Sequence, residues 1–213
     1  MLISERFLLL LLNDRKGKSH FFANFDKNLG LAGAMILDLG FKGKVSISGK
    51  KLRILDYHAS GDPIIDKILV FLYNTKKPLK LKRWLVKIAR SYKKFSMCLY
   101  QRLENYGILT SGLKANRYYF IKPEIKQSLL KQIKQGMIDD MNPDIELLCL
   151  LSLITLCGFL DKCIAKEYRK IVRKLIYQFI FSNNYRSETL EFVLKVINMV
   201  DEIIKIKGRI IPM

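Results

Sequence analysis

The residues best suited to chemistry lie in one basic segment, residues 67–102. It contains eleven Lys or Arg residues and no Asp or Glu. Ammonium and guanidinium groups bind phosphates and carboxylates, so this composition favours an anionic partner, either a membrane surface or a nucleic acid. Apolar residues recur through the segment at helical spacings: Trp84, Leu85, Ile88, Ala89, Tyr92, Phe95 and Leu99. This spacing predicts one helix or two consecutive helices, with Trp84 and Tyr92 in the core and the cations on the opposite side.

Residues that could catalyse a reaction are sparse. His20 lies beside two phenylalanines and His58 in an expected loop, and neither context indicates a general base or a metal ligand. Asp62 and Asp66 could form a carboxylate pair, but a helix start with Asp62 as its N-cap explains both residues better. The sequence has no G-x-S-x-G motif, P-loop or dinucleotide-binding glycine pattern. We therefore expect no enzymatic activity, no metal site and no cofactor.

Charge and cysteine content narrow the class of protein. The formal net charge is +19, which favours a polyanionic partner, although Lys is abundant throughout and a Lys-rich solvated surface is the plain alternative. The four cysteines contain no C-x-x-C pair: Cys98, Cys149, Cys157 and Cys163. Buried free thiols in a reducing compartment explain them better than a zinc site.

Two apolar runs resemble membrane spans but are too short. Residues 7–12 have charged residues on both sides, which is the wrong context for a signal peptide core. Residues 147–160 fall short of the roughly 20 residues that a span requires, so we expect a buried central helix there. The sequence predicts a soluble protein whose membrane contact is peripheral.

The remaining patterns predict a mainly α-helical protein with two short β-hairpins. Alternation and a glycine turn predict a first hairpin at residues 45–55 and a second at residues 108–121. Asp62 and Pro63 indicate a helix start. Further helices are expected near residues 4–12, 27–39, 64–72, 124–135, 144–160, 165–181 and 188–206. No Pro-, Gly- or Ser-rich linker divides the chain, so one domain covering residues 1–213 is expected.

Helix followed by hairpin is also the pattern of a winged-helix protein that binds nucleic acid. In that interpretation residues 91–105 form the recognition helix, residues 116–121 belong to the wing, and Lys93, Lys94 and Arg102 contact the nucleic acid. The apolar half from residue 144 onward has no evident role in such a small module. We keep nucleic-acid binding as the alternative to lipid binding.

Several motifs occur in a characteristic order. They are an acidic residue with a leucine run and a basic-glycine turn (residues 4–17), a glycine-rich helix with a basic-glycine-basic sequence after it (30–45), the sequence ASGDPIID (59–66), the sequence RLENYGILT (102–110), and the apolar helix ending at Asp161. In order and spacing they resemble the Golgi phosphoprotein 3 family, which has prokaryotic relatives. The resemblance covers nearly the whole chain.

The resemblance implies a mainly α single domain with a four-helix core, surrounding helices and protruding hairpins. It also implies a peripheral membrane protein on the cytosolic face, at the Golgi in eukaryotes, that binds phosphatidylinositol 4-phosphate. Family members act in membrane trafficking as adaptors for the cytosolic tails of membrane enzymes. The second hairpin, through Tyr118, Tyr119 and Phe120, would contact the membrane or a second copy of the chain.

The family's phosphoinositide pocket uses a Trp, an early Arg and two later basic residues. The corresponding positions here are Ala23, Ala32, Lys93 and Ser96, with Phe22 beside the first. Because only Lys93 is basic, we expect a looser anion-binding surface for acidic lipids, with phosphatidylinositol 4-phosphate as the lipid that the resemblance implies. The candidate headgroup-binding residues are Phe22, Lys42, Arg90, Lys93, Lys94 and Arg102.

Overall fold

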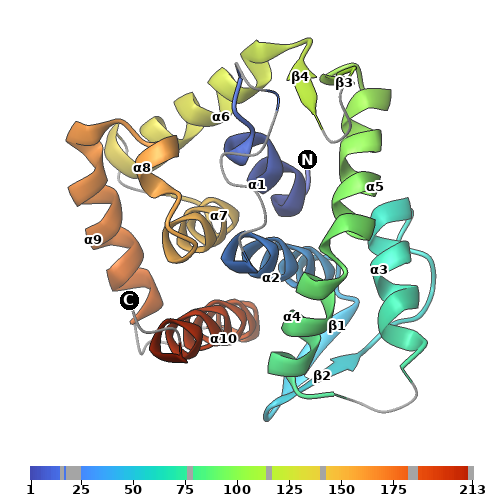
Figure 1. The fold of residues 1–213 in the computed structure, drawn as a ribbon. Coiled ribbons are helices and arrows are strands. Elements are labelled where there is room, and N and C mark those ends of the chain that lie inside the picture. The colour runs from blue at the N-terminus through green and yellow to red at the C-terminus, as the bar shows by residue number, and fades with distance from the viewer. Residues whose placement is uncertain are drawn as a thin grey trace.

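One helix, α2 (Phe25–Phe41), lies at the centre of the computed structural model and is surrounded by other helices on every side (Figure 1). Its sequence is apolar all round from Leu29 to Leu37, so no face is left for water. Glycines at positions 30 and 33 let neighbouring side chains approach its backbone closely. The structure describes residues 1–14, 17, 25–75, 79–113, 117–139, 143–181 and 187–210, except for the side chains of residues 138, 139 and 207–210.

The elements before the second hairpin form a helical body with one hairpin at its edge. In chain order they are α1 (Ile3–Leu11), α2, β1 (Val45–Ser48), β2 (Lys51–Ile54), α3 (Pro63–Tyr73), α4 (Leu81–Arg90) and α5 (Tyr92–Asn105). Strands β1 and β2 are antiparallel, with Val45 opposite Ile54. Gly49 adopts a φ of 58° in the turn between them, a conformation that glycine adopts without strain. The first predicted hairpin is therefore confirmed.

The second half of the chain begins with a hairpin and continues as helices. Its elements are β3 (Leu109–Ser111), β4 (Tyr118–Phe120), α6 (Pro123–Lys134), the π-helical turn η1 (Gln135–Asp139), α7 (Ile145–Leu156), α8 (Leu160–Cys163), the 3-10 turn η2 (Lys166–Tyr168), α9 (Arg169–Ile180) and α10 (Glu188–Ile210). Strands β3 and β4 pair with Leu109 opposite Phe120. The expected helix over residues 144–160 is wrong in one respect, because Gly158, at a φ of 76°, ends α7 and turns the chain into α8.

Helix α2 packs against α4, α7 and α10, and α10 also packs on α4 and α7, so these four helices form the core, with the other helices around it. The residues of α10 that face α2 and α7 include Val193, Val196, Ile197 and Val200, all with 0% exposure. Trp84 of α4 is buried as predicted, whereas Tyr92 is half-buried. The prediction of a mainly α protein with a four-helix core and short hairpins is confirmed.

The described cysteines are free thiols, and none belongs to a cluster of possible metal ligands in the described part of the chain. Burial raises the pKa of both the Cys149 and the Cys157 thiol well above the ordinary value for cysteine. Neither is therefore a reactive thiolate. Among the helices that the structure describes, none combines the length and the apolar character needed to cross a bilayer.

Gly30 marks a close approach to α2 that sequence alone would not reveal. A Cβ at this position would lie 2.5 Å from Sγ of Cys157 and 2.6 Å from Cζ of Phe7. Gly30→Ala is therefore expected to lower the free energy of unfolding by about 1–3 kcal/mol, as overpacking does in cores. Urea unfolding measures this loss. The double variant Gly30→Ala/Cys157→Ala should lose less than the sum of the single variants, and strict additivity would contradict the clash.

Candidate functional site

The basic segment folds as α4 and α5, which Ser91 separates, and it packs beside α3. Lys67 of α3 donates to Sγ of Cys98 on α5 at 2.9 Å, so these two helices are neighbours at the surface. Nζ of Lys94 lies 5.7 Å from the ring centre of Phe71 and 5.9 Å from that of Phe95. Cation–π attraction holds this ammonium group along the seam between α3 and α5.

Lys87 of α4 is held at the same seam. Its ammonium group donates to Oγ1 of Thr75 at 2.6 Å. It also lies 5.2 Å from the ring centre of Phe71 and 5.1 Å from that of Trp84. The aliphatic stem of Lys87 thus covers the aromatic core, while the charge remains at the edge of the protein.

Arg83, Arg90 and Lys93 extend this row of cations into solvent, where all three are exposed. We call the whole set the α3–α5 cationic surface, and its members are Lys67, Arg83, Lys87, Arg90, Lys93 and Lys94. Among the residues that the structure describes, none of these cations forms an ion pair with a carboxylate. Six like charges on neighbouring helices repel one another, so an external anion stabilises the arrangement.

Exposed apolar side chains accompany these cations. Val70 on α3, one turn after Lys67, is 56% exposed, and Met97 on α5, one turn after Lys93, is 49% exposed. Tyr73, one turn after Val70, is 62% exposed. Basic residues interleaved with exposed apolar and aromatic residues are typical of surfaces that lie at a membrane interface.

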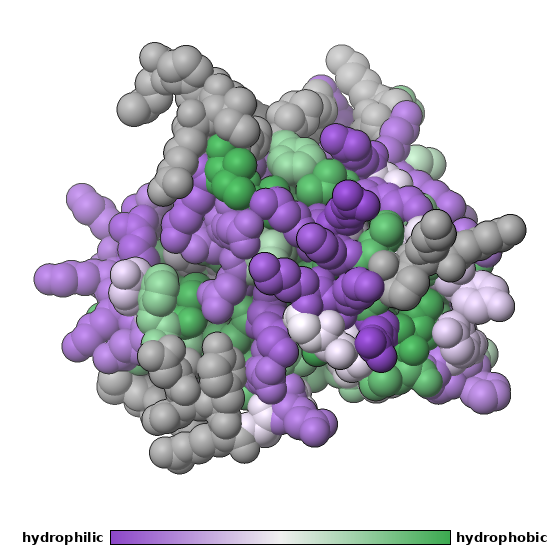
Figure 2. All heavy atoms as spheres, turned by 90° about the horizontal axis from the view of Figure 1, so that it is seen from below, coloured by the Kyte–Doolittle hydropathy of each residue, from purple (hydrophilic) through white to green (hydrophobic). Residues whose placement is uncertain are grey.

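The face formed by α10 and the β1–β2 hairpin is different. Seen from below the view of Figure 1, it is covered mainly by hydrophilic side chains (Figure 2). The cations on and beside α10 are paired with acids: Lys82 with Glu202 at 2.9 Å, Lys195 with Glu191 at 2.5 Å and Lys205 with Asp201 at 2.5 Å. The described cations of α10 are therefore compensated, whereas the exposed Lys50, Lys51 and Arg53 of the β1–β2 hairpin form no ion pair with a described carboxylate.

The structure brings three of the predicted headgroup-binding residues together and places Lys42 and Arg102 elsewhere. Arg90, Lys93 and Lys94 lie at the α4–α5 junction. Lys42 follows the C-terminal end of α2 and lines a different cavity. Phe22 lies outside the residues that the structure describes.

Arg102, another predicted phosphate contact, is occupied by the protein's own carboxylates. Its Nε donates to Glu5 at 2.7 Å, and its Nη1 donates to both carboxylate oxygens of Asp62 at 2.7 Å. Asp62 also accepts from the backbone N–H groups of Ile64 and Ile65, which confirms it as the N-cap of α3. Arg102 therefore joins α1, α3 and α5 and is not a free cation.

These charges shift the ionisation of Asp62. Burial alone would raise the pKa of its carboxyl, but the Arg102 guanidinium and two backbone N–H groups hold that pKa below its usual value. Together with Lys42, Tyr106 and Glu146, the Arg102 cluster lines a cavity of about 400 Å³ beside the start of α1. Carboxylates outnumber free cations there, so this cavity is poorly suited to a phosphate.

The three described positions that the resemblance assigns to a phosphoinositide pocket do not converge on an open site. Ala32 has 0% exposure and Ser96 has 4%, whereas Lys93 is exposed. Ala23 lies outside the described residues. Lys93 therefore lies with its cationic neighbours on the surface, whereas Ala32 and Ser96 are buried.

The three aromatic residues of the second hairpin pack on the body instead of projecting from it. Tyr118 stacks on Tyr100 with ring centres 4.1 Å apart, and the Tyr119 ring covers Gly17. Phe120 lies 5.6 Å from the ammonium group of Lys126. All three are half-buried, and among the described residues of this hairpin the large apolar ones that are exposed are Leu113 and Ile121.

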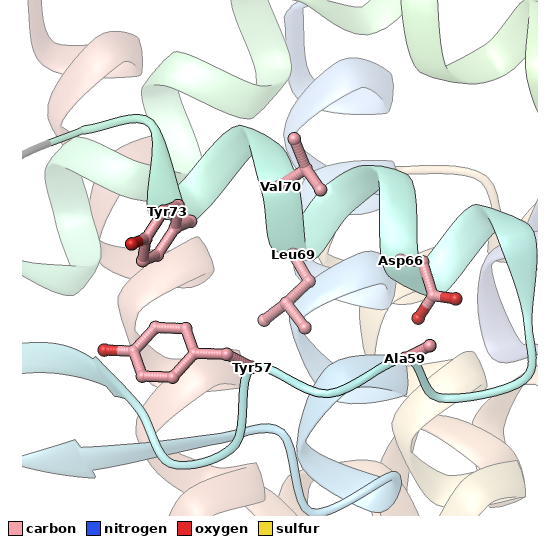
Figure 3. A pocket seen from close by; sticks show the side chains of 6 residues that line it. All are labelled: Tyr57, Ala59, Asp66, Leu69, Val70 and Tyr73. Carbon is pink, nitrogen blue, oxygen red and sulfur yellow. The ribbon is translucent and has the colours of Figure 1, made fainter.

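A cavity of about 550 Å³ beside α3 was missed by the sequence interpretation (Figure 3). Tyr57 and Tyr73 meet edge to face at 5.2 Å at one end, and Leu69 lies between them and Asp66. The Asp66 carboxylate is already engaged by the N–H and the hydroxyl of Ser60, each at 2.7 Å. The cavity therefore offers mainly apolar and aromatic surface, and its rim shares Val70 with the exposed side of α3.

Asp38 of α2 is a buried carboxylate beside the start of α1, and its pKa is strongly raised. It accepts from the N–H of Ile3 at 2.8 Å and of Ser4 at 3.1 Å, and so caps the first turn. Burial raises the pKa of Asp38 to about 6, since these donors only partly offset the loss of water. The group binds its proton more tightly in the folded state, so its stabilising effect is present below about pH 4 and is lost as the pH rises through 6.

The pH dependence of Asp38→Asn tests this shift. Between pH 4 and 7 the unfolding free energy of the variant relative to the original chain is expected to rise by roughly 2–3 kcal/mol. All other titratable groups are the same in both proteins, so their contributions cancel in the difference between the two unfolding free energies. A difference that does not change with pH would contradict a raised pKa.

The fold and its surfaces define a mainly α-helical protein with an uncompensated cationic face and, among its described residues, no group of possible metal ligands. A search among curated proteins finds no match. A family model described as Golgi phosphoprotein 3 (GPP34) matches residues 3–180, and the chain belongs to this family.

Proposed function

We propose that this protein is a non-enzymatic peripheral membrane protein and that the α3–α5 cationic surface binds the headgroups of anionic phospholipids. The observation that carries the proposal is the row of six cations without a described carboxylate partner, interleaved with exposed Val70 and Met97. Each basic residue near an anionic bilayer contributes about 1 kcal/mol. Membership of the Golgi phosphoprotein 3 family supports this function over other roles for a basic surface.

The arrangement favours attraction by charge over recognition of one headgroup. Arg90, Lys93 and Lys94 are exposed and spread along a surface, whereas selective binding of a phosphate monoester needs donors that converge on it. Phosphatidylinositol 4-phosphate then binds as one acidic lipid among others, more tightly in proportion to its charge.

Flotation with vesicles tests the proposal. The protein is expected to float with vesicles of phosphatidylcholine and phosphatidylserine, but not with phosphatidylcholine alone, and recovery should fall as salt is raised. A second series replaces phosphatidylserine by phosphatidylinositol 4-phosphate at equal total charge, and similar recovery is expected. Equal recovery with neutral and acidic vesicles would overturn the electrostatic mechanism. Duplex DNA binding with a steep salt dependence, and no vesicle binding, would favour the nucleic-acid alternative.

A further inference from the structure

Helix α9 presents a second basic and aromatic face. Val172, Ile176 and Ile180 turn inward and are 0–8% exposed, which fixes the opposite side of the helix in solvent. Lys170 and Lys174 lie one turn apart on that side, and Tyr177 and Phe181 continue the same row at helical spacing. This row leads from two cations to two aromatic rings.

The aromatic end of this row is exposed although it is large and apolar. Tyr177 is 65% exposed and Phe181 53%, and their ring centres are 4.3 Å apart. Ile171, on the neighbouring row, is 42% exposed. Two exposed rings in contact, with an exposed isoleucine on the neighbouring row, favour an interaction site over a solvated face.

The basic end retains free positive charge. Arg169 and Arg173 are occupied by Asp161, with Arg173 at 2.8 Å from its carboxylate. The exposed Lys166, Lys170 and Lys174 form no ion pair with any carboxylate that the structure describes. A helix with lysines toward one end and exposed aromatic residues toward the other suits the interface of an anionic bilayer, where the rings enter the headgroup region.

The α9 face lies on the other side of the molecule from the α3–α5 cationic surface. Figure 1 places α9 at the left edge of the body and α3 and α5 at the right edge, with α2 and α7 between them. Helix α9 packs on α7 and α10, whereas α3 and α5 pack on α2. One flat membrane cannot contact two surfaces on opposite sides of a rigid body.

We infer that the α9 face binds a second anionic bilayer, so that one molecule bridges two acidic membranes. This inference rests on the proposed function of the α3–α5 cationic surface. A chain of this length folds into a body about 40 Å across, so bridged bilayers are expected about 40 Å apart.

Vesicle clustering tests the bridge separately from binding. Vesicles of phosphatidylcholine and phosphatidylserine are mixed with the full chain, and cluster size is followed by light scattering while flotation measures binding. The original chain is expected to cluster these vesicles, with a gap of about 40 Å in electron cryo-micrographs. Binding without clustering would overturn the bridge and leave the proposed function intact, whereas absence of binding would overturn both.

Variants locate the second contact. Lys170→Gln/Lys174→Gln/Phe181→Ser is expected to float as the original chain does, within about twofold, but to require at least about 10-fold more protein for clustering. The control Lys122→Gln/Lys131→Gln removes two exposed lysines from the α6 region and is expected to change neither readout. A thermal melt establishes that each variant is folded. Clustering unchanged in the α9 variant would overturn the inference.

Two other occupants of the α9 face give distinct results. If sedimentation shows a dimer that the α9 variant abolishes, the face binds a second copy of the chain and the inference is overturned. It is also overturned if the α9 variant loses binding to duplex DNA while clustering is retained. A monomer that clusters vesicles only with α9 intact supports the bridge.

Discussion

The triple variant Arg90→Gln/Lys93→Gln/Lys94→Gln is expected to bind acidic vesicles about 100-fold more weakly than the original chain. Three basic residues close to the headgroups contribute about 3 kcal/mol in total, and 1.4 kcal/mol corresponds to a factor of ten. All three are exposed and form no ion pair with a described carboxylate, so their replacement removes binding energy with little effect on stability. Affinity is measured by titrating lipid at low and at high salt.

A second variant that loses the same number of positive charges distinguishes binding through the α3–α5 cationic surface from attraction by net charge. Lys50→Gln/Lys122→Gln/Lys131→Gln also removes three exposed cations, but from the β1–β2 turn and the α6 region. It should lose less than about threefold in affinity, because at physiological salt charges beyond about 8 Å are largely screened. Equal losses in the two variants would show that the +19 net charge attracts the vesicles without a defined surface.

Replacing Arg102 by alanine is expected to lower the free energy of unfolding by about 3–5 kcal/mol. The change leaves the Glu5 carboxylate, whose side chain is 3% exposed, without its ion-pair partner in a place that water barely reaches. It also removes the hydrogen bonds from Nη1 to both carboxylate oxygens of Asp62, whose side chain is 21% exposed. Lysine cannot replace both contacts because it has a single ammonium group, so Arg102→Lys is expected to lose a large part of the same stability.

Comparison with an exposed arginine makes this prediction specific. Arg173 pairs with Asp161 at 2.8 Å, but both side chains are more than half exposed. Arg173→Ala should therefore cost no more than about 1 kcal/mol. Chemical denaturation of the two variants measures both values, and similar losses would show that burial of the Arg102 cluster is energetically unimportant. At a temperature where Arg102→Ala is folded, its affinity for acidic vesicles should equal that of the original chain. This result would contradict the headgroup contact that the sequence predicted for Arg102.

Local signals in the sequence were sufficient to place most elements. Asp62 and Pro63 define the start of α3 because the carboxylate caps free N–H groups and proline fits the first turn. Gly49 and Gly107 mark ends of elements because both adopt positive φ. Gly158 carried the same signal, but the apolar residues on both sides of it hid the break between α7 and α8.

The distribution of charges between the surface and the interior was not predictable in the same way. Arg102 and Glu5 are 97 residues apart, and no local pattern indicates that they meet. Arg102 and Lys93 look alike in the sequence, yet one closes an internal cluster and the other faces solvent. The contacts that Tyr118 and Tyr119 make within the protein were likewise not predictable, since Tyr100 and Gly17 belong to other segments of the chain. Helical spacing predicts which side of a helix is apolar, but not which neighbours its polar side will find.

Helix α10 has a consequence for synthesis of the chain. It lies beyond the last residue matched by the family, yet Val193, Val196, Ile197 and Val200 form part of the core against α2 and α7. While a ribosome is still translating this last helix, the corresponding sides of α2 and α7 have nothing to cover them. Until α10 has been synthesised and has packed, the nascent polypeptide therefore exposes apolar surface that favours aggregation.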